Sequence, residues 1–259
     1  TLQTGRCLRE YVAQLGRIPD WFDYHAALSQ TIEGNLPPFS DPDHHCYVKR
    51  VPLGVCGLVT SWNHPLLISN KKISVALAAG NTVVVKPPPP APCSILEMAD
   101  ILREAGLPDG VLNVVPSSTA GPVLTSHPAV VKVDLTGGTE TGQKIGASAG
   151  AMVKHYTAEL GGNAAVMVFD DVSSVDNAVN GVTFAAYVAS GQTCVSAKRI
   201  LIQDTIYDEF VDKLVKKVKS LRLLDPMDMN SHMGPLVHEA ALEKVQQQVD
   251  EAVDFGAKV

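Results

Sequence analysis

The chain has 259 residues, 46% of them hydrophobic and 19% charged, which is enough apolar material for one large or two modest globular domains and excludes a disordered tail. Twenty-one Lys and Arg against 27 Asp and Glu give a net charge of −6 with histidine neutral, and no long basic run is present, so we expect no nucleic-acid partner. The five cysteines lack a Cys-x-x-Cys spacing, which argues against a disulfide framework or a zinc knuckle and predicts a reducing, cytoplasmic compartment.

The apolar stretches are short and broken by glycine, proline or charge, well below the length of a membrane span, so we expect no membrane segment. The histidines are scattered without metal-ligand spacing, and we predict no metal site.

Short apolar runs alternate with amphipathic stretches, the pattern of a mostly parallel sheet with helices on its faces. Glycine and proline clusters mark the ends of these segments. In chain order we predict a strand at Val55–Val59, a helix at Leu66–Ala79, a strand at Thr82–Val85, a helix at Ser94–Glu104, strands at Val111–Val115 and Val130–Leu135, a helix after the turn Thr136–Gly142, strands at Val153–Thr157 and Ala164–Val168, a helix at Asp176–Tyr187, a strand at Arg199–Ile202, and helices at Tyr207–Leu221 and Glu239–Phe255.

The turn Thr136–Gly142 places glycines before a helix N-terminus, where unpaired backbone N–H groups and the helix dipole favour a phosphate. Its spacing departs from the Gly-x-Gly-x-x-Gly dinucleotide fingerprint, and it lacks the Lys-Ser/Thr pair of a phosphate loop. The turn by itself therefore leaves cofactor binding and an ordinary strand-to-helix connection both open.

A cysteine and a carboxylate lie in two glycine-containing segments further along the chain. Cys194 ends the run Gly191-Gln192-Thr193-Cys194, and Glu159 opens the run Glu159-Leu160-Gly161-Gly162. A thiol nucleophile and a base are the minimum requirement for covalent acyl chemistry. We therefore expect Cys194 and Glu159 to act together, although a lone cysteine is more often a buried apolar residue and a lone glutamate a solvated one.

Six motifs in sequence order resemble the aldehyde dehydrogenase superfamily, whose members oxidise aldehydes to acids with NAD or NADP. They are Ser61-Trp62-Asn63-His64-Pro65, Val85-Lys86-Pro87, Gly106-Leu107-Pro108-Asp109-Gly110, the Gly137 turn, Glu159-Leu160-Gly161-Gly162 and Gly191-Gln192-Thr193-Cys194. The resemblance implies an α/β chain with a doubly wound, mostly parallel dinucleotide-binding sheet in residues 1–158. The first part of an α/β catalytic domain would follow in residues 159–259.

For catalysis, the resemblance implies that Cys194 attacks the aldehyde carbonyl to give a thiohemiacetal, and that hydride loss leaves a thioester. Glu159 would activate the water that hydrolyses the thioester, a general-base contribution typically of about 10²- to 10⁴-fold. Asn63 would donate to the developing oxyanion, and losing such a donor typically costs about 2.7 to 4 kcal/mol of barrier. From the residues alone, Asn63 could instead be a helix cap.

For the cofactor, NAD or NADP, the resemblance implies that Lys86 contacts the adenosine ribose and that Gly137 and Gly138 approach the pyrophosphate, with Gly142 in the same turn. Trp62 would line the cofactor cleft. From the residues alone, Lys86 could be a surface lysine. Where the family often has a carboxylate that holds the ribose hydroxyls, this chain has Pro89, so we expect NADP to be tolerated.

Other departures from the family are at Ala189, Ser190 and Thr193, while His64 and Tyr187 would face the substrate tunnel. These residues favour an aromatic or semi-polar aldehyde as the small-molecule partner. The family's later Glu-x-Phe-Gly-Pro segment has no counterpart before Val259, so we expect an incomplete chain, and a homo-oligomer, dimer or tetramer, when full-length.

Two alternative functions stay open. One is an acylating reductase that passes the thioester to coenzyme A or phosphate, for which Glu159 would be dispensable. The other is a non-catalytic structural relative.

Overall fold

The computed structural model describes residues 1–258 and divides into two compact units. One unit is residues 14–161, and the other is residues 1–13 together with the described residues from 162 onward. The predicted division at residue 158 lies close to this boundary, but the first thirteen residues group with the second unit rather than with the sheet. They do so because Leu8 N donates to Pro226 O at 2.8 Å and the Cys7 thiol contacts Ser231 Oγ at 3.6 Å.

The larger unit is built on a five-stranded sheet in which every neighbouring pair is parallel, which confirms the predicted α/β class. The strand order is β3-β2-β1-β4-β5, so the order reverses between β1 and β4. In open α/β sheets, ligands bind at the carboxyl ends of the strands near such a reversal. The strands are β1 (Val55–Val59), β2 (Thr82–Lys86), β3 (Leu112–Val114), β4 (Val130–Thr136) and β5 (His155–Glu159).

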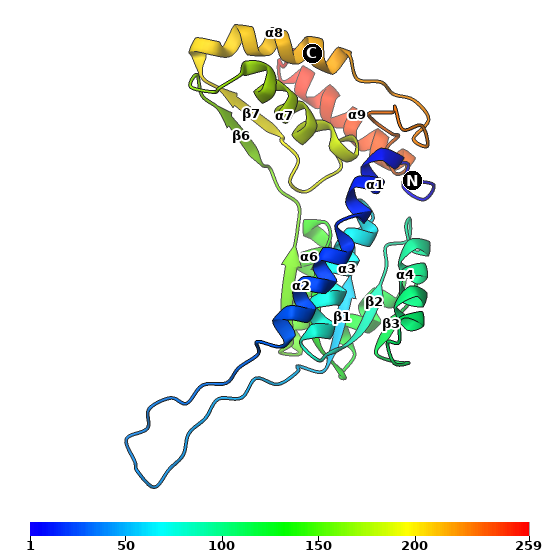
Figure 1. Cartoon of the computed structure of the whole chain (residues 1–259). Helices are drawn as coiled ribbons and strands as arrows, with labels where there is room; N and C mark the ends of the chain where they lie inside the picture. The colour runs from blue at the N-terminus through cyan, green and yellow to red at the C-terminus, as the bar shows by residue number, and fades with distance from the viewer. Residues whose placement is uncertain (259) are drawn as a thin grey trace. The chain divides into compact units, whose positions relative to one another are not determined.

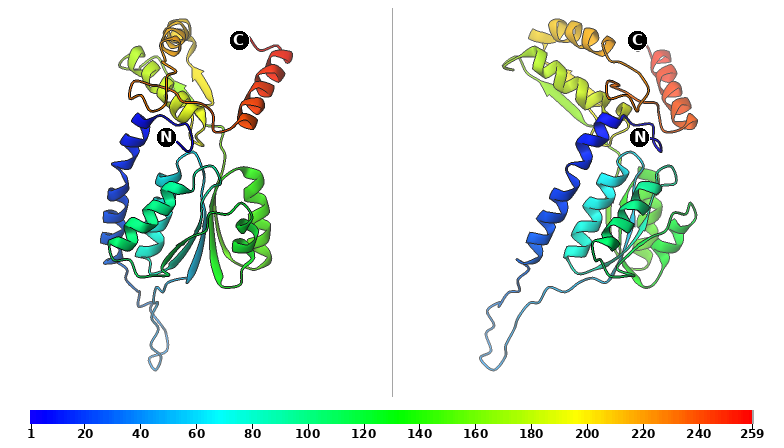
Figure 2. Two further views of the ribbon diagram at one scale, coloured as in Figure 1. Left: turned by 90° about the vertical axis from the view of Figure 1, so that its right-hand side faces the viewer. Right: turned by 45° about the vertical axis from the view of Figure 1, so that its right-hand side comes forward.

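Helices cover both faces of this sheet, as Figures 1 and 2 show. Val83 and Val85 point to one face of the sheet, where they form a core with residues of β1, α3 and α4. Val84 points to the opposite face, where it packs against a second core that includes residues of α5 and α6. This alternation follows from the two-residue period of a strand. The helices are α2 (Ile18–Ser29), α3 (Pro65–Ala78), α4 (Cys93–Glu104), α5 (Ala120–Ser126) and α6 (Thr139–Ala151).

Between α2 and β1 the chain runs as a long extended arm, which is the projecting loop of Figure 1. Its two limbs meet in one antiparallel bridge, Asn35 with Val48. Leu36, Phe39 and Tyr47 on this arm are exposed.

The last strand of the sheet differs from its prediction. We expected Val153–Thr157, but Val153 has φ 54° in the turn after α6, and β5 begins two residues later at His155. A β-branched residue seldom adopts a left-handed conformation, so the pattern at Val153 indicated a strand. As a result, Glu159 is the last residue of the strand rather than part of the following turn.

The smaller unit pairs two parallel strands, β6 and β7, against α7 and α8. Val168, Val179 and Val182 surround Phe210, which is fully buried. On α8, Lys216, Lys217 and Lys219 are exposed, and Lys213 pairs with Asp176 and Glu209, which is typical of a solvated helix face. The elements of this part are α1 (Leu8–Leu15), β6 (Ala165–Val168), α7 (Val175–Tyr187), the 3₁₀ turn η1 (Val188–Gly191), β7 (Arg199–Ile202), the 3₁₀ turn η2 (Asp204–Ile206), α8 (Tyr207–Lys219) and α9 (Glu239–Asp254).

Candidate functional site

Most of the predicted cofactor and catalytic residues of the larger unit lie at the carboxyl edge of the sheet. Lys86 ends β2, Glu159 ends β5, and Asn63 follows β1 by four residues. Their strands are in register at this edge, where Val59 is opposite Lys86 and Thr136 is opposite Glu159. Because all five strands run the same way, their ends gather the functional groups at one edge.

The Asn63 side chain is held in one orientation. Its Oδ1 accepts a hydrogen bond from Ser61 Oγ at 2.9 Å and from the His64 backbone N at 3.0 Å. The His64 N–H can only donate, so it requires the amide oxygen on its side and the amide nitrogen faces the opposite side. This is the polarity that a donor to an oxyanion needs. Trp62, next to it, is half-buried.

His64 begins α3 and is buried, with 8% of its surface exposed. Its Nδ1 lies 2.6 Å from Gln14 Nε2. We expected His64 to face a substrate tunnel, and within its own unit this ring contacts Gln14.

The glycine turn after β4 lies beside Glu159. Gly137 N donates to Glu159 O at 3.0 Å, and Gly138 occupies the position that caps α6, where a Cβ would meet no heavy atom within 4 Å. At Gly138 the first N–H groups of α6 therefore have no side chain over them, which suits the close approach of an anion, whereas a Cβ on Gly137 would lie 3.2 Å from Leu135 Cδ1. Glu159 itself is exposed.

Gly142 has a different environment from the other two glycines. It is buried inside α6, where a Cβ would lie 2.5 Å from Leu160 Cδ2, and its carbonyl accepts from Tyr156 Oη at 2.8 Å. The absence of a side chain at Gly142 therefore has a packing explanation, the close approach of α6 to Leu160.

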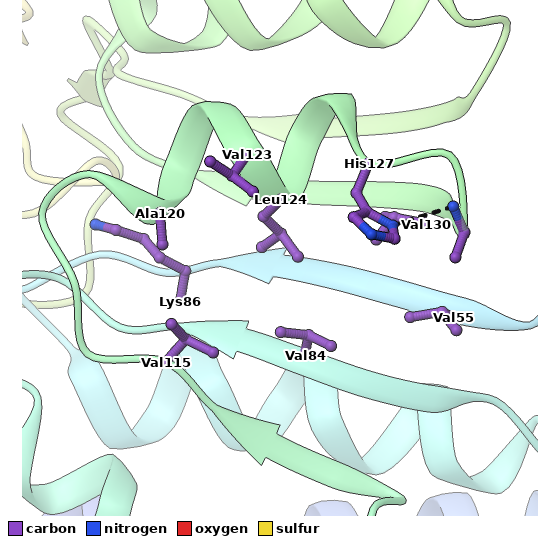
Figure 3. Close-up of a pocket in the computed structure, with 10 residues that line it drawn as sticks. Val55, Val84, Lys86, Val115, Ala120, Val123, Leu124, His127 and Val130 are labelled. Atoms are coloured by element: carbon purple, nitrogen blue, oxygen red, sulfur yellow. Dashed lines mark hydrogen bonds between the residues drawn. The ribbon is translucent and has the colours of Figure 1, made fainter.

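An apolar cavity of about 290 Å³ lies between the sheet and α5. Figure 3 shows Val123 and Leu124 of the helix on one side and Val84 of the sheet on the other, with Lys86 near Ala120. Burial lowers the pKa of Lys86 from its usual 10.5, because desolvation disfavours the ammonium form. The remaining lining residues are Val55, Val115, His127, Ala129 and Val130.

Except for Lys86, none of the cavity residues was predicted from the sequence to be functional. Helix α5 was itself not predicted, because its seven residues are too few to show a helical period. One signal for α5 was available in the sequence. Val84 is an apolar residue on the sheet face opposite to that of Val83 and Val85, and an apolar sheet face needs a helix to cover it.

The predicted nucleophile belongs to the smaller unit. Cys194 is exposed, while its neighbour Thr193 is buried. A Cβ on Gly162 would lie 3.0 Å from the carbonyl oxygen of Cys194, so the chain passes close to the backbone of Cys194 where the sequence has glycine. Of the predicted catalytic residues, Asn63 and Glu159 therefore lie in one unit and Cys194 in the other.

Two further observations concern residues 1–258. Within them, no three His, Cys, Asp or Glu side chains are grouped so that they could hold a metal ion. The same residues contain no helix long and apolar enough to cross a membrane.

Known proteins resemble this chain over its whole length. The model of the aldehyde dehydrogenase family matches residues 1–259. A relative from Acinetobacter baylyi, (Z)-2-((N-methylformamido)methylene)-5-hydroxybutyrolactone dehydrogenase, is 38% identical over 261 residues, covering 100% of this chain and 53% of that protein. The chain thus spans about half the length of the curated relatives it matches.

Solved structures agree with this match. An NADP-dependent enzyme from E. coli superposes with a TM-score of 0.96 at 36% identity, covering 100% of this chain and 54% of that one. PnpE from Pseudomonas sp. WBC-3, which has also been solved with nicotinamide adenine dinucleotide, superposes with a TM-score of 0.95 at 37% identity, covering 99% of this chain and 53% of PnpE. On these grounds, the chain belongs to the aldehyde dehydrogenase family.

Proposed function

We propose that this chain carries the cofactor site and the nucleophile of an NAD(P)-dependent enzyme that oxidises an aldehyde to a carboxylic acid. The observation that carries the proposal is the set of groups at the carboxyl edge of the sheet. There, the oriented amide of Asn63, the carboxylate of Glu159 and the turn at Gly137 and Gly138, which is open at Gly138, lie at the ends of neighbouring strands. Lys86 at the same edge borders the apolar cavity.

The proposed reaction begins at Cys194. Its thiolate forms a bond to the aldehyde carbon, and the carbonyl electrons move to oxygen, where the N–H groups of Asn63 and of the Cys194 backbone stabilise the charge. A bound NAD or NADP would supply the hydride acceptor, and loss of hydride from this carbon would leave a thioester on Cys194. Glu159 removes a proton from a water molecule that adds to the thioester carbon. The C–S bond breaks, the acid leaves and the thiol is restored.

The cavity beneath α5 fits the adenine end of a dinucleotide. A volume of about 290 Å³ with apolar walls suits a flat aromatic base, and Lys86 at its border offers a donor to the attached ribose. The glycine turn next to β5 would receive the pyrophosphate at the N-terminus of α6. Residues from 14 to about 158 would thus form the dinucleotide-binding domain.

We further propose that NADP is tolerated. The residue three positions after Lys86 is Pro89, which is exposed and carries no negative charge, so a 2′-phosphate would meet no repulsion there. Among the similar structures, one is named an NADP-dependent enzyme and another was solved with nicotinamide adenine dinucleotide. Comparing kcat/KM for the two cofactors tests the proposal, and a preference for NAD of about a hundredfold or more would overturn it.

The proposed substrate is an aromatic or semi-polar aldehyde. The support is limited to the side chains near the nucleophile, where Tyr187 is half-buried and Ala189 and Thr193 are small and buried. A substrate panel in which only short aliphatic aldehydes react would contradict this choice. We also propose a cytoplasmic location and, for the full-length protein, a homo-oligomer, either a dimer or a tetramer. Light scattering on the purified full-length protein measures the oligomeric state.

One assay separates the proposed function from its alternatives. The protein is mixed with NAD or NADP and an aldehyde series, reduced nicotinamide is followed by absorbance, and the acid is quantified. We expect acid production in the wild type and its loss in Cys194→Ala and Glu159→Gln. A requirement for coenzyme A or phosphate, with Glu159→Gln still active, would favour the acylating reductase. Cofactor binding without turnover of any aldehyde would favour the non-catalytic relative.

A further inference from the structure

The loop that leads to Cys194 contains a run of left-handed backbone. Ala189 and Ser190 have φ of 53° and 55°, and Gly191 follows with φ of 74°. Only the glycine adopts this conformation without steric cost. Two successive non-glycine residues in this region persist only when their surroundings hold them there.

The carboxylate of Glu10 is one of these restraints. The backbone N–H of Ala189 donates to Glu10 Oε1 at 3.2 Å and to Oε2 at 3.1 Å, across a separation of 179 residues in the sequence. A hydrogen bond to an ionised acceptor is stronger than one between neutral groups. Glu10 therefore fixes the first left-handed residue from outside the loop.

Glu10 is itself held by Arg6, one turn earlier in the chain. Arg6 Nε lies 2.5 Å from Glu10 Oε2, and the two side chains are only 5% and 13% exposed. The Arg6 guanidinium also stacks 5.1 Å from the centre of the Tyr11 ring. A largely buried pair of this kind contributes little net stability but fixes geometry, because either charge left alone would be costly.

The other restraints lie within the loop and on residues 234–237. Ser190 Oγ donates to Gly234 O at 2.7 Å. Gln192 connects two segments, since its Nε2 donates to Ala189 O at 3.1 Å and its Oε1 accepts from Val237 N at 3.1 Å. With this set in place, the loop leaves Cys194 exposed.

We propose that Glu10, held by Arg6, is a positioning residue that sets the conformation of the nucleophile loop and thereby the presentation of the Cys194 thiol. The inference rests on the proposed function, in which Cys194 is the nucleophile. Glu10 acts through the Ala189 N–H and requires no contact with substrate or cofactor.

The test measures thiol presentation and turnover separately. Alkylation of Cys194 by iodoacetamide is followed by peptide mass spectrometry across a pH series, with the exposed Cys46 and Cys93 as internal references. In Glu10→Ala, we expect both the alkylation rate of Cys194 and kcat to fall by at least about tenfold. The alkylation rates of the two reference cysteines and the Kd of the cofactor should not change. Glu10→Gln keeps an oxygen acceptor for Ala189 N–H and should fall between wild type and Glu10→Ala.

The matched control is Glu209→Ala, which removes an exposed glutamate that pairs with Lys213 on α8 and should alter neither readout. The proposal would be overturned if Glu10→Ala has a lower melting temperature but the same Cys194 alkylation rate and kcat as this control. Glu10 would then contribute to stability alone. If Glu10→Ala fails to fold, Glu10→Gln and Ser190→Ala are measured instead, and unchanged Cys194 alkylation in both overturns it. Slowed alkylation in a protein that oxidises no aldehyde would support the positioning role and reject the proposed function.

Discussion

Replacing Gly142 by alanine tests how closely α6 approaches the end of β5. A Cβ at this position would lie 2.5 Å from Leu160 Cδ2 and 3.1 Å from Cδ1, so the leucine must move. Overpacking of this kind typically costs about 1 to 3 kcal/mol. Alanine is also the better helix former by about 1 kcal/mol, which offsets part of that cost. We expect Gly142→Ala to lie between neutral and about 2 kcal/mol less stable than wild type.

Gly150→Ala is the matched control because it lies in the same helix and its Cβ would meet no heavy atom within 4 Å. The propensity gain is common to both variants, so their difference isolates the contact with Leu160. We expect Gly142→Ala to melt about 2 to 12 °C below Gly150→Ala, from about 2 to 4 °C per kcal/mol in a protein of this size. Thermal and urea unfolding measure the difference.

The same substitution has a consequence for activity. Leu160 directly follows Glu159, so a shift of Leu160 should displace the proposed base and lower kcat more than Gly150→Ala does. Equal stabilisation by both alanines would refute the reasoning, because it would mean that α6 and Leu160 are not in close contact. Normal stability with lost cofactor affinity would instead support the direct cofactor role that the sequence predicted for Gly142.

Three further predictions concern the larger unit. Lys72 and Asp134 form an ion pair with side chains only 9% and 16% exposed. Asp134→Leu alone should therefore lower the free energy of unfolding by about 3 to 5 kcal/mol, because it leaves the Lys72 charge buried and unpaired. Adding Lys72→Met should restore most of that stability, as measured by denaturant unfolding. Burial lowers the pKa of Lys86, so near pH 10.5 the unfolded state binds more protons than the folded state. The stability of the wild type relative to Lys86→Met should therefore rise as the pH approaches 10.5. A difference in melting temperature between the two proteins that does not depend on pH would contradict this. Ala120→Trp should fill the cavity beneath α5 and weaken cofactor binding by at least about tenfold in a fluorescence titration, whereas Gly121→Ala, whose Cβ meets open space, should bind normally.

The strands and most helices were predictable because their signals are local. Thr82–Lys86 is a continuous apolar run that ends in a charge, and the period of α8 places its lysines away from Phe210. The N-terminal helices α1 and α2 and the extended arm were not predicted. For α1 the local signal was present and the prediction missed it, since Leu8, Tyr11, Val12 and Leu15 have the i, i+3, i+4, i+7 spacing of a helix. Its packing depends on residues more than 200 positions away, as in the hydrogen bond between Leu8 and Pro226.

The candidate site divides in the same way. The sequence predicted roles for Asn63, Glu159 and Cys194 because the short motifs around them resemble those of the aldehyde dehydrogenase family. It could not identify the cavity, because Val84, Val115 and Leu124 come from separate elements that meet only in the folded sheet.

The sequence by itself determined the α/β class, the order of the strands along the chain and the residue types that could perform acyl chemistry, because strand period, helix period and turn residues act over a few neighbouring positions. The tertiary structure alone decided that Gly142 packs on Leu160 and that Glu10 reaches the backbone of Ala189. Such contacts depend on how the side chains of distant segments fill shared space, and no local pattern in the chain encodes that fit.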